Sequence, residues 1–251
     1  MWSIINQIKS AFQPPCILCG SHPHQQDNLC AQCLIDMPWS KQGCSLCAEH
    51  MGIMGLDGDQ MCANCLQQTP PYTRTVCAFN YLVPISGLVN QFKHQHNLAA
   101  GRLLTSCLSQ TLFTKITQGQ ITIPQLVIPV PLHKRRLRQR GFNQAQVIAM
   151  GISQSLNLKI NTRLCHREVY HSPQQGQSRQ QRITQMKGVF NIAPKEVDQR
   201  INSIAIIDDV MTTGATVQAL SKKLITAWGG PLDIQIWCVA RAQPPDILLD
   251  W

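Results

Sequence analysis

The sequence has little charge, and acidic residues are its scarcer kind. Charged residues make up 14% of its 251 residues, and 22 Lys and Arg against 13 Asp and Glu give a formal net charge of +9. A basic excess favours an anionic partner such as phosphate, a nucleotide or nucleic acid, although it does not indicate a fold. A chain of this length can bury a substantial core, so one main domain with a small appendage is expected.

The sequence also lacks long apolar runs, internal repeats and low-complexity tracts. Its opening segment, MWSIINQIKSAF, is interrupted by polar residues and shows neither the apolar core of a membrane helix nor a small-residue cleavage site. We therefore expect no membrane span and predict a cytoplasmic protein.

Cysteines, by contrast, are abundant and concentrated near the N-terminus. Eight of the twelve form Cys-x-x-Cys pairs within the first 65 residues: Cys16 and Cys19, Cys30 and Cys33, Cys44 and Cys47, and Cys62 and Cys65. Two such pairs supply the tetrahedral four-sulfur shell that zinc prefers, and disulfides are rare in the cytosol. The sequence therefore predicts two structural Zn²⁺ sites. The other four cysteines are scattered through apolar segments and are expected to be small buried hydrophobes.

The four Cys-x-x-Cys pairs can combine into two metal sites in two ways. Joining neighbours in sequence gives a double zinc ribbon, whereas joining alternate pairs gives a cross-braced arrangement. In either case each four-thiolate zinc site has a formal charge of about −2, which lowers the whole-chain balance from +9 to roughly +5. A structural role is the simplest, because about 65 residues with few large apolar groups need metal to fold. A docking or nucleic-acid surface is the alternative.

After a linker at TPPY (69–72), the composition becomes that of an α/β domain, predicted to span 73–243 and to be followed by a tail at 244–251. Strands are expected at VCAFNYL, at QLVIPVPL (125–132), at IAII and at LDIQIWCVAR. Helices are expected at about 85–95, 98–115 and 143–156 and in TVQALSKKLITAWGG. Their alternation predicts a parallel sheet with helices on its faces. The polar segment 163–190 has no clear period and suggests a mobile loop or a hairpin.

The stretch IAIIDDVMTTGAT (204–216) ends a buried strand in Asp208 and Asp209. Ligands of a parallel sheet lie beyond the carboxyl ends of its strands, and two adjacent carboxylates cannot both enter the core without a large desolvation cost. Carboxylates suit the paired hydroxyls of a ribose or a magnesium ion. The small residues that follow offer backbone N–H groups and a helix N-terminus to a phosphate. Together these features predict a pentose phosphate site.

Two other interpretations compete with this one. The acidic end could be plain structural capping, with Thr216 as the N-cap of the next helix. It could also be the second acidic motif of a P-loop hydrolase, but the chain has no Gly-x-x-x-x-Gly-Lys-Ser/Thr element, and no Rossmann glycine fingerprint either.

The same stretch resembles the phosphoribosyl diphosphate (PRPP) motif of type I phosphoribosyltransferases at every defining position. The segment VIPVPLHKRRLRQRGFNQA narrows the resemblance, because it is similar to the ComF family of competence-associated proteins. These proteins join an N-terminal double zinc ribbon to a phosphoribosyltransferase domain. The resemblance runs from CILCG to IQIWCVAR.

The resemblance implies a role for each matching position. Asp208 and Asp209 would be the catalytic pair that holds the ribose hydroxyls. The 5′-phosphate would lie in the turn formed by Met211, Thr212, Thr213, Gly214, Ala215 and Thr216. Pyrophosphate would face Pro131, Leu132 and His133, with Arg135, Arg136 and Arg140 as counter-charges. A solvated basic face is the alternative for these arginines. In the polar segment, Arg167, Gln174, Ser178 and Arg182 follow the family outline.

Three positions depart from the family pattern, namely His171, Gln177 and Gln185. Lys93 lies where relatives carry a lysine after an aromatic residue, and it could equally extend along the surface as a structural side chain.

Two classes of function follow from the resemblance. One is an enzyme that displaces pyrophosphate from PRPP, with Mg²⁺ bridging substrate oxygens and an acceptor that the sequence does not mark. The other is a non-catalytic adaptor of DNA uptake or DNA processing that uses the fold as a regulatory module. In such a role, single-stranded DNA and competence proteins would be its partners.

Overall fold

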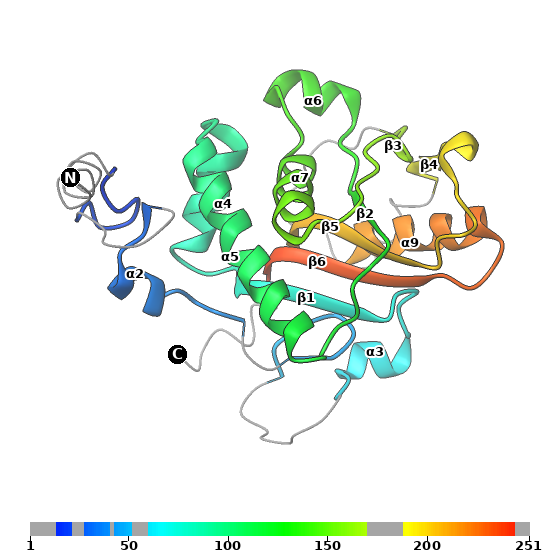
Figure 1. Cartoon of the computed structure of the whole chain (residues 1–251), viewed down its shortest axis with the longest axis horizontal. Coiled ribbons are helices and arrows are strands. Elements are labelled where there is room, and N and C mark those ends of the chain that lie inside the picture. Colours follow the sequence, from blue (N-terminus) through cyan, green and yellow to red (C-terminus); the bar gives the residue numbers. More distant parts are fainter. Residues whose placement is uncertain (1–13, 22–27, 41–42, 52–59, 170–187, 244–251) are drawn as a thin grey trace, which may run out of the picture.

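The computed structural model describes residues 14–21, 28–40, 43–51, 60–169 and 188–243 (Figure 1). Its helices are α2 (Ala31–Ile35), α3 (Ala63–Gln67), α4 (Ile85–His94), α5 (Leu98–Thr117), α6 (Lys134–Arg140), α7 (Gln144–Leu156), the 3₁₀ turn η2 (Pro194–Glu196) and α9 (Ala215–Trp228). Its strands are β1 (Arg74–Asn80), β2 (Leu126–Pro129), β3 (Cys165–Arg167), β4 (Phe190–Ile192), β5 (Ser203–Met211) and β6 (Asp233–Arg241). Within these ranges, no helix combines the length and apolar character needed to cross a membrane.

Four strands form a parallel sheet in the order β1-β6-β5-β2. The register aligns Ile207 of β5 with Trp237 of β6 and with Pro129 of β2, so these three strands end at the same edge. The two strands at the centre of the sheet are almost continuously buried, as expected when helices cover both faces. The structure therefore confirms the predicted parallel sheet flanked by helices.

Alternation along β5 divides the core into two layers. Ala205 and Ile207 face one layer, which contains α4, α5 and α7, whereas Ile204 and Ile206 face the other, which contains α9 and the β3–β4 pair. In Figure 1, α5 and α7 lie in front of the sheet and α9 lies behind it. This period of two is what a strand buried on both sides requires.

A glycine allows α4 and α5 to lie against each other. A Cβ atom at Gly101 of α5 would lie 2.5 Å from Cε2 of Phe92 on α4, so any larger residue would displace that ring. The Phe92 ring also stacks on Phe142, with centroids 5.3 Å apart. Because Lys93 follows Phe92 directly, this packing fixes the position of Lys93 at the end of α4.

The cysteine-rich region packs on both layers of the core. Cys16, Leu29 and Met37 join the layer of α4, α5 and α7, and Cys44, Cys47 and Cys65 join the layer of α9. Trp39 forms an antiparallel bridge with Phe79 of β1, and their rings lie 4.5 Å apart. The predicted linker TPPY is also anchored, since Tyr72 is buried in the second layer. The boundary at residue 72 remains a prediction, because chain on both sides of it shares one core.

Two parts of the structure, α6 and the β3–β4 pair, were not specified by the predicted elements. The basic stretch after β2 was not predicted as a helix, yet it forms α6, which His133 caps and Gly141 ends in a left-handed conformation at φ 74°. In the polar segment, β3 and β4 pair antiparallel, which confirms a hairpin-like pairing of its two ends. Gln174, Ser178, Arg182 and the tail 244–251 lie outside the described residues.

Candidate functional site

The two aspartates lie near the carboxyl end of β5 and point to different sides of the strand. Residues two apart on a strand face the same side, so Asp208 lies on the side of Ile206 and Asp209 on the side of Ile207. Each carboxylate also accepts a backbone hydrogen bond, from Asp209 N to Asp208 Oδ1 at 2.9 Å and from Val210 N to Asp209 Oδ1 at 2.6 Å. Both carboxylates are therefore held close to the strand end rather than extended into solvent.

Lys93 pairs with the second of these carboxylates. Its Nζ lies 2.8 Å from Asp209 Oδ2, and the side chains are 21% and 14% exposed. In this contact the ammonium compensates a carboxylate that is partly removed from water. Sequence reasoning left the role of Lys93 open, and the structure places it inside the site.

Asp208 is the electrostatically strained member of the pair. Burial and the neighbouring charge of Asp209 raise the pKa of Asp208 to about 7, although Lys93 and Arg167 act in the opposite direction. Such a carboxyl favours a partner that donates hydrogen bonds or carries positive charge.

Three cations interact with the aspartates, namely Lys93, Arg140 and Arg167, and Arg136 lies close enough to Arg140 and Arg167 to lower the pKa of both. These four are called here the site cations. Burial lowers the pKa of Arg140, while Asp209 raises it. Burial and Arg136 likewise lower the pKa of Arg167, while Asp208 raises it. Four cations beside two carboxylates leave an excess of positive charge, which suits a ligand with several negative charges.

The segment Met211–Thr216, called here the phosphate turn, leads from β5 into α9. Gly214 has φ 74°, a left-handed conformation that favours glycine, and a Cβ there would lie 2.9 Å from Met211 Cε. Helix α9 begins at Ala215 with Gly214 as N-cap, which has no side chain to cap the helix, and Thr213 Oγ1 accepts a hydrogen bond from Ala215 N at 3.4 Å. Thr216 lies inside the helix, so it is not the N-cap. A helix N-terminus with a glycine cap favours an anion.

The end of β2 lies beside this motif. Val130 N donates to Ile207 O at 2.9 Å, which brings the following residues Pro131, Leu132 and His133 next to the acidic end of β5. Asn143 holds this loop, since its Nδ2 donates to Val130 O at 3.0 Å while its Oδ1 caps α7. The structure thus gives Asn143 a positioning role that the sequence did not reveal.

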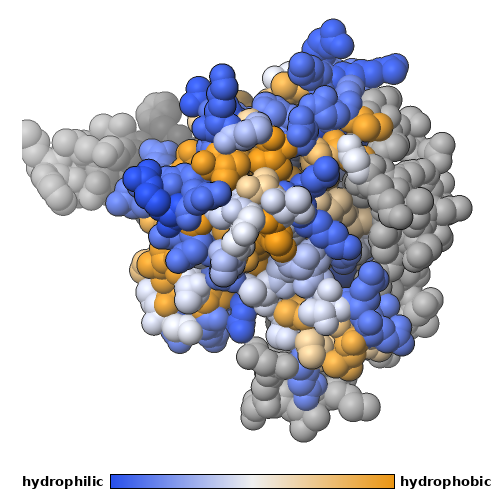
Figure 2. All heavy atoms as spheres, turned by 90° about the vertical axis from the view of Figure 1, so that its right-hand side faces the viewer, coloured by the Kyte–Doolittle hydropathy of each residue, from blue (hydrophilic) through white to orange (hydrophobic). Residues whose placement is uncertain are grey.

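Helix α6 has two basic sides. Arg136 and Arg140, one turn apart, are half-buried, and Arg140 interacts with Asp209, whereas Lys134, Arg135 and Arg138 are exposed. Arg140 Nη1 also donates to Gln144 Oε1 at 3.1 Å. In Figure 2, hydrophilic side chains gather at the top of the molecule, the level at which Figure 1 shows α6. The two alternatives for this segment, site and solvated face, therefore apply to different sides of one helix.

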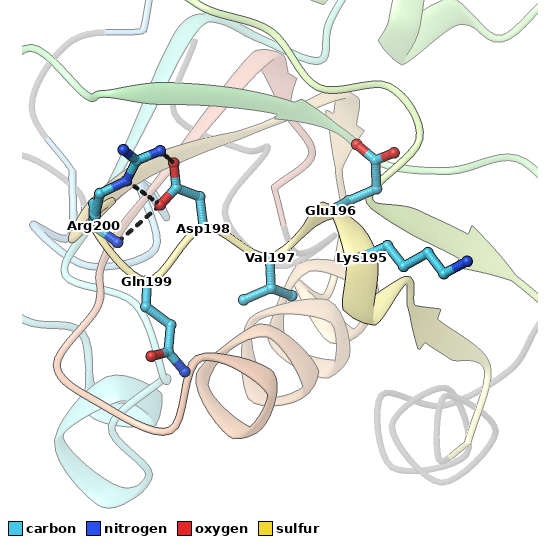
Figure 3. Close-up of a pocket in the computed structure, with 6 residues that line it drawn as sticks. All are labelled: Lys195, Glu196, Val197, Asp198, Gln199 and Arg200. Atoms are coloured by element: carbon cyan, nitrogen blue, oxygen red, sulfur yellow. Dashed lines mark hydrogen bonds and ion pairs between the residues drawn. The ribbon is translucent and has the colours of Figure 1, made fainter.

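Two surface hollows lie elsewhere. One is lined by residues 195–200, where Figure 3 shows Asp198 and Arg200 turned toward each other and Lys195 pointing away. The other is lined by Thr122, Ile123, Gln125, Asn202, Ser203, Pro231 and Asp233. Both lie near residues that enter the strands, opposite the edge at which a parallel sheet binds ligands. We therefore assign the site to the carboxyl edge.

The cysteines form two groups from neighbouring pairs. The first cysteine group is Cys16, Cys19, Cys30 and Cys33, and the second cysteine group is Cys44, Cys47, Cys62 and Cys65. In each group the Sγ atoms lie within 4.8 Å of one another, with 3.7 Å between Cys19 and Cys30 and 3.6 Å between Cys47 and Cys62. These separations match the edge of a tetrahedron with metal–sulfur bonds of about 2.3 Å. Both groups could hold a metal ion, and the cross-braced alternative is wrong.

One thiol of the second cysteine group has a pKa that favours the thiolate. All eight cysteines of the two groups are free of disulfides. A hydrogen bond from Cys47 lowers the pKa of Cys44 to about 4, although burial acts in the opposite direction. A thiolate is the form of cysteine that binds metal.

These features define the class of the protein: an α/β protein with a phosphoribosyltransferase-like motif at its sheet edge and an N-terminal region that can bind two metal ions. Competence protein F of Haemophilus influenzae is 31% identical over 232 residues, which cover 92% of this chain and 98% of that protein. DNA utilization protein YhgH of Escherichia coli K12 is 27% identical over 227 residues, which cover 90% and 89% of the two chains. The chain belongs to the competence protein F family.

Two further comparisons add little. A scan against models of protein families gave no match. Among solved structures, a purine phosphoribosyltransferase from Pyrococcus horikoshii is 16% identical and covers 57% of this chain and 84% of its own, with a TM-score of 0.34. With so low a score, the fold class follows from the sheet and helices themselves.

The raised pKa of Asp208 predicts that Asp208→Asn stabilises the folded protein by an amount that depends on pH. An ordinary aspartate has a pKa of 3.8, so between about pH 4 and pH 7 the folded state binds more protons than the unfolded state and loses stability as the pH rises. Asparagine mimics the protonated form. Its free energy of unfolding should exceed that of the parent protein at pH 8, by at most about 4 kcal/mol, and should match it at pH 4.

Chemical denaturation at both pH values measures this difference. Asp198→Asn is the matched control, because it removes an aspartate that is paired with Arg200 away from the sheet edge and should give no gain. An Asp208→Asn difference that is the same at pH 4 and pH 8 would contradict the assignment.

Proposed function

We propose that the carboxyl edge of the sheet binds PRPP or a closely related pentose phosphate. The observation that carries the proposal is the adjacency of three parts: the paired aspartates, the glycine-capped phosphate turn and the site cations. No other described part of the chain combines carboxylates for hydroxyls with a glycine N-cap and several arginines. Membership of the competence protein F family supports the same ligand through the resemblance of its motif.

The parts of PRPP would then divide among the parts of the site. Asp208 and Asp209 would accept hydrogen bonds from the ribose hydroxyls, and the phosphate turn would hold the 5′-phosphate. Pro131, Leu132 and His133 would face the pyrophosphate, with Arg136 and Arg140 as counter-charges. Carboxylate oxygens and phosphates are ligands that suit Mg²⁺, which would neutralise part of the pyrophosphate charge when bound.

Catalysis would require an acceptor at the ribose anomeric carbon. In that reaction the acceptor forms a bond to this carbon as pyrophosphate leaves, and the site cations stabilise the charge that develops on the leaving group. A binding protein with PRPP as a regulatory ligand would use the same residues without an acceptor. Release of pyrophosphate from PRPP that occurs only with an added acceptor would favour the enzyme.

PRPP binding should depend on the two aspartates. In Asp208→Asn/Asp209→Asn, the affinity for PRPP with Mg²⁺ should fall about 100-fold or more, because hydrogen bonds to charged groups contribute about 1.5–3 kcal/mol each. Calorimetry or equilibrium dialysis with labelled PRPP measures this loss. Asp198→Asn, an exposed aspartate paired with Arg200, should bind like the parent protein. If the parent protein does not bind PRPP, the proposal is wrong.

Both cysteine groups are proposed to hold structural Zn²⁺. Four thiolates at tetrahedral spacing favour zinc over harder metals, and a region with so small a core gains its folding energy from the metal. Elemental analysis should find two zinc ions per chain, and only one in Cys44→Ser. Loss of secondary structure on chelation should begin in residues 16–65. An unchanged spectrum after complete removal of zinc would contradict the assignment.

A role in DNA uptake or DNA processing in the cytoplasm is the second part of the proposal. The names of the relatives, competence protein F and DNA utilization protein YhgH, favour it. The exposed side of α6 supports it physically, since Lys134, Arg135 and Arg138 form a basic row directed away from the aspartates. A single strand bound there would lie beside the PRPP site rather than inside it, and competence proteins would be further partners.

A salt titration should distinguish the roles of the two sides of α6. Lys134→Ala/Arg138→Ala should weaken single-stranded DNA binding and reduce the slope of log affinity against log salt by about 0.7 for each phosphate that the variant no longer neutralises. PRPP binding should remain. The matched control Lys222→Ala/Lys223→Ala removes two exposed lysines from α9 and should leave the slope unchanged. If both double variants change the salt dependence equally, the basic row of α6 has no specific role in DNA binding.

A further inference from the structure

Arg241, the last residue of β6, is a buried cation outside the predicted site. Its side chain is 5% exposed, and the residue lies where β6 leaves the sheet beside the end of β5. A buried guanidinium is strongly unfavourable unless hydrogen bonds and opposite charges compensate it. Its partners therefore indicate why the chain keeps it there.

Two of these partners belong to the phosphate turn. Arg241 Nη1 donates to Met211 O at 3.2 Å and also to Thr212 O. In a trans peptide the N–H group points opposite to the C=O group of the same plane. Holding these two carbonyls toward Arg241 therefore turns the following N–H groups, those of Thr212 and Thr213, away from it. Fixed N–H directions are what a backbone phosphate site requires.

The other partners belong to the second cysteine group and its surroundings. Arg241 Nε donates to Cys47 O at 2.9 Å, and Nη2 lies 3.5 Å from Glu49 Oε2. Glu49 Oε2 in turn lies 3.8 Å from the Sγ atoms of both Cys47 and Cys62. With metal bound, a four-thiolate group and Glu49 would together be strongly anionic, and Arg241 is positioned as their counter-charge.

Tyr72 gives a second contact between the same two parts. It is buried in the layer that contains Cys44, Cys47 and Cys65, and a Cβ at Gly214 would lie 3.6 Å from its hydroxyl. Met211 also belongs to this layer. The second cysteine group and the phosphate turn therefore share one packed interior, and a displacement of the cysteine knuckle would be transmitted to the turn.

We propose that Arg241 is a positioning residue that ties the phosphate turn to the second cysteine group, so that the ribose phosphate site forms fully only when that group holds its metal. The identity of the ligand in this inference rests on the proposed function. The positioning role of Arg241 does not, since the Arg241 contacts exist without any ligand. The first cysteine group contributes to the other core layer and has no contact of this kind among the described residues.

Arg241→Met tests the link with two readouts. Its affinity for PRPP with Mg²⁺ should fall about 10- to 100-fold, as is typical when a supporting partner of a site is removed. The ¹⁵N order parameters of Thr212, Thr213 and Gly214 should fall from about 0.85 to below about 0.6, while those of the sheet stay unchanged. The matched control is Arg200→Met, which removes an exposed arginine bonded only to Asp198 among its described partners and should change neither readout.

Substitutions in the two cysteine groups test whether the order of the phosphate turn depends on metal in the second group. Cys44→Ser, prepared with zinc and checked for the loss of one ion, should lower the order parameters of the phosphate turn as Arg241→Met does. Cys16→Ser, which affects the first cysteine group, should leave them unchanged. Glu49→Gln keeps the shape of its side chain and removes only the charge, so it provides the test if Arg241→Met does not fold.

The outcomes separate the two proposals. If the parent protein does not bind PRPP, the proposed ligand is wrong, and the order parameters alone decide the role of Arg241. A rigid phosphate turn in both Arg241→Met and Glu49→Gln would overturn the positioning role. Equal loosening by Cys44→Ser and Cys16→Ser would overturn the specific link to the second cysteine group.

Discussion

Two adjacent carboxylates at the end of a buried parallel strand impose a charge requirement on every element near them. Asp208 and Asp209 point to opposite sides of β5, and Lys93, which pairs with Asp209, is joined by a second cation near Asp208. Helix α4 supplies Lys93 on one side, and β3 supplies Arg167 on the other. The Phe92–Gly101 packing, the hairpin-like β3–β4 pair and the capped α6 can each be understood as the means of holding a cation at this edge.

The same requirement explains how the cysteine-rich region becomes part of the domain. Its two groups pack on opposite core layers, and residues near Trp39 add an antiparallel bridge to the edge strand β1, which is otherwise open on that side. The second cysteine group reaches the carboxyl edge through Arg241, a cation that serves the thiolates on one side and the backbone carbonyls of the phosphate turn on the other. The region is thus connected to the candidate site through Arg241.

Local patterns made much of this predictable from sequence. The apolar run before Asp208, the Thr-Thr-Gly turn and the Cys-x-x-Cys spacing each encode geometry within a few residues, so the strand, the turn and two four-cysteine metal sites could be predicted from the sequence. Which cysteine pairs join could not. Helix α6 was missed because KRRLRQR has a single apolar residue, Leu137, and so no amphipathic period. Its stability comes from the His133 cap and the Gly141 end. Arg241, Glu49 and Tyr72 were missed because their contacts join segments more than 100 residues apart or lie beyond a presumed linker.

The division of α6 into two basic sides bears on how a small ligand and a polyanion could share one protein. A single basic patch would bind PRPP and DNA competitively, because both would neutralise the same cations. Here half-buried Arg140 lies near Asp209, with Arg136 beside it, whereas Lys134, Arg135 and Arg138 are exposed on the other side of the helix. Occupancy of the inner site would fix α6 through Arg136 and Arg140 without covering its outer row. A ligand that orders the helix would thereby strengthen binding on its outer face, so the two ligands would cooperate rather than compete.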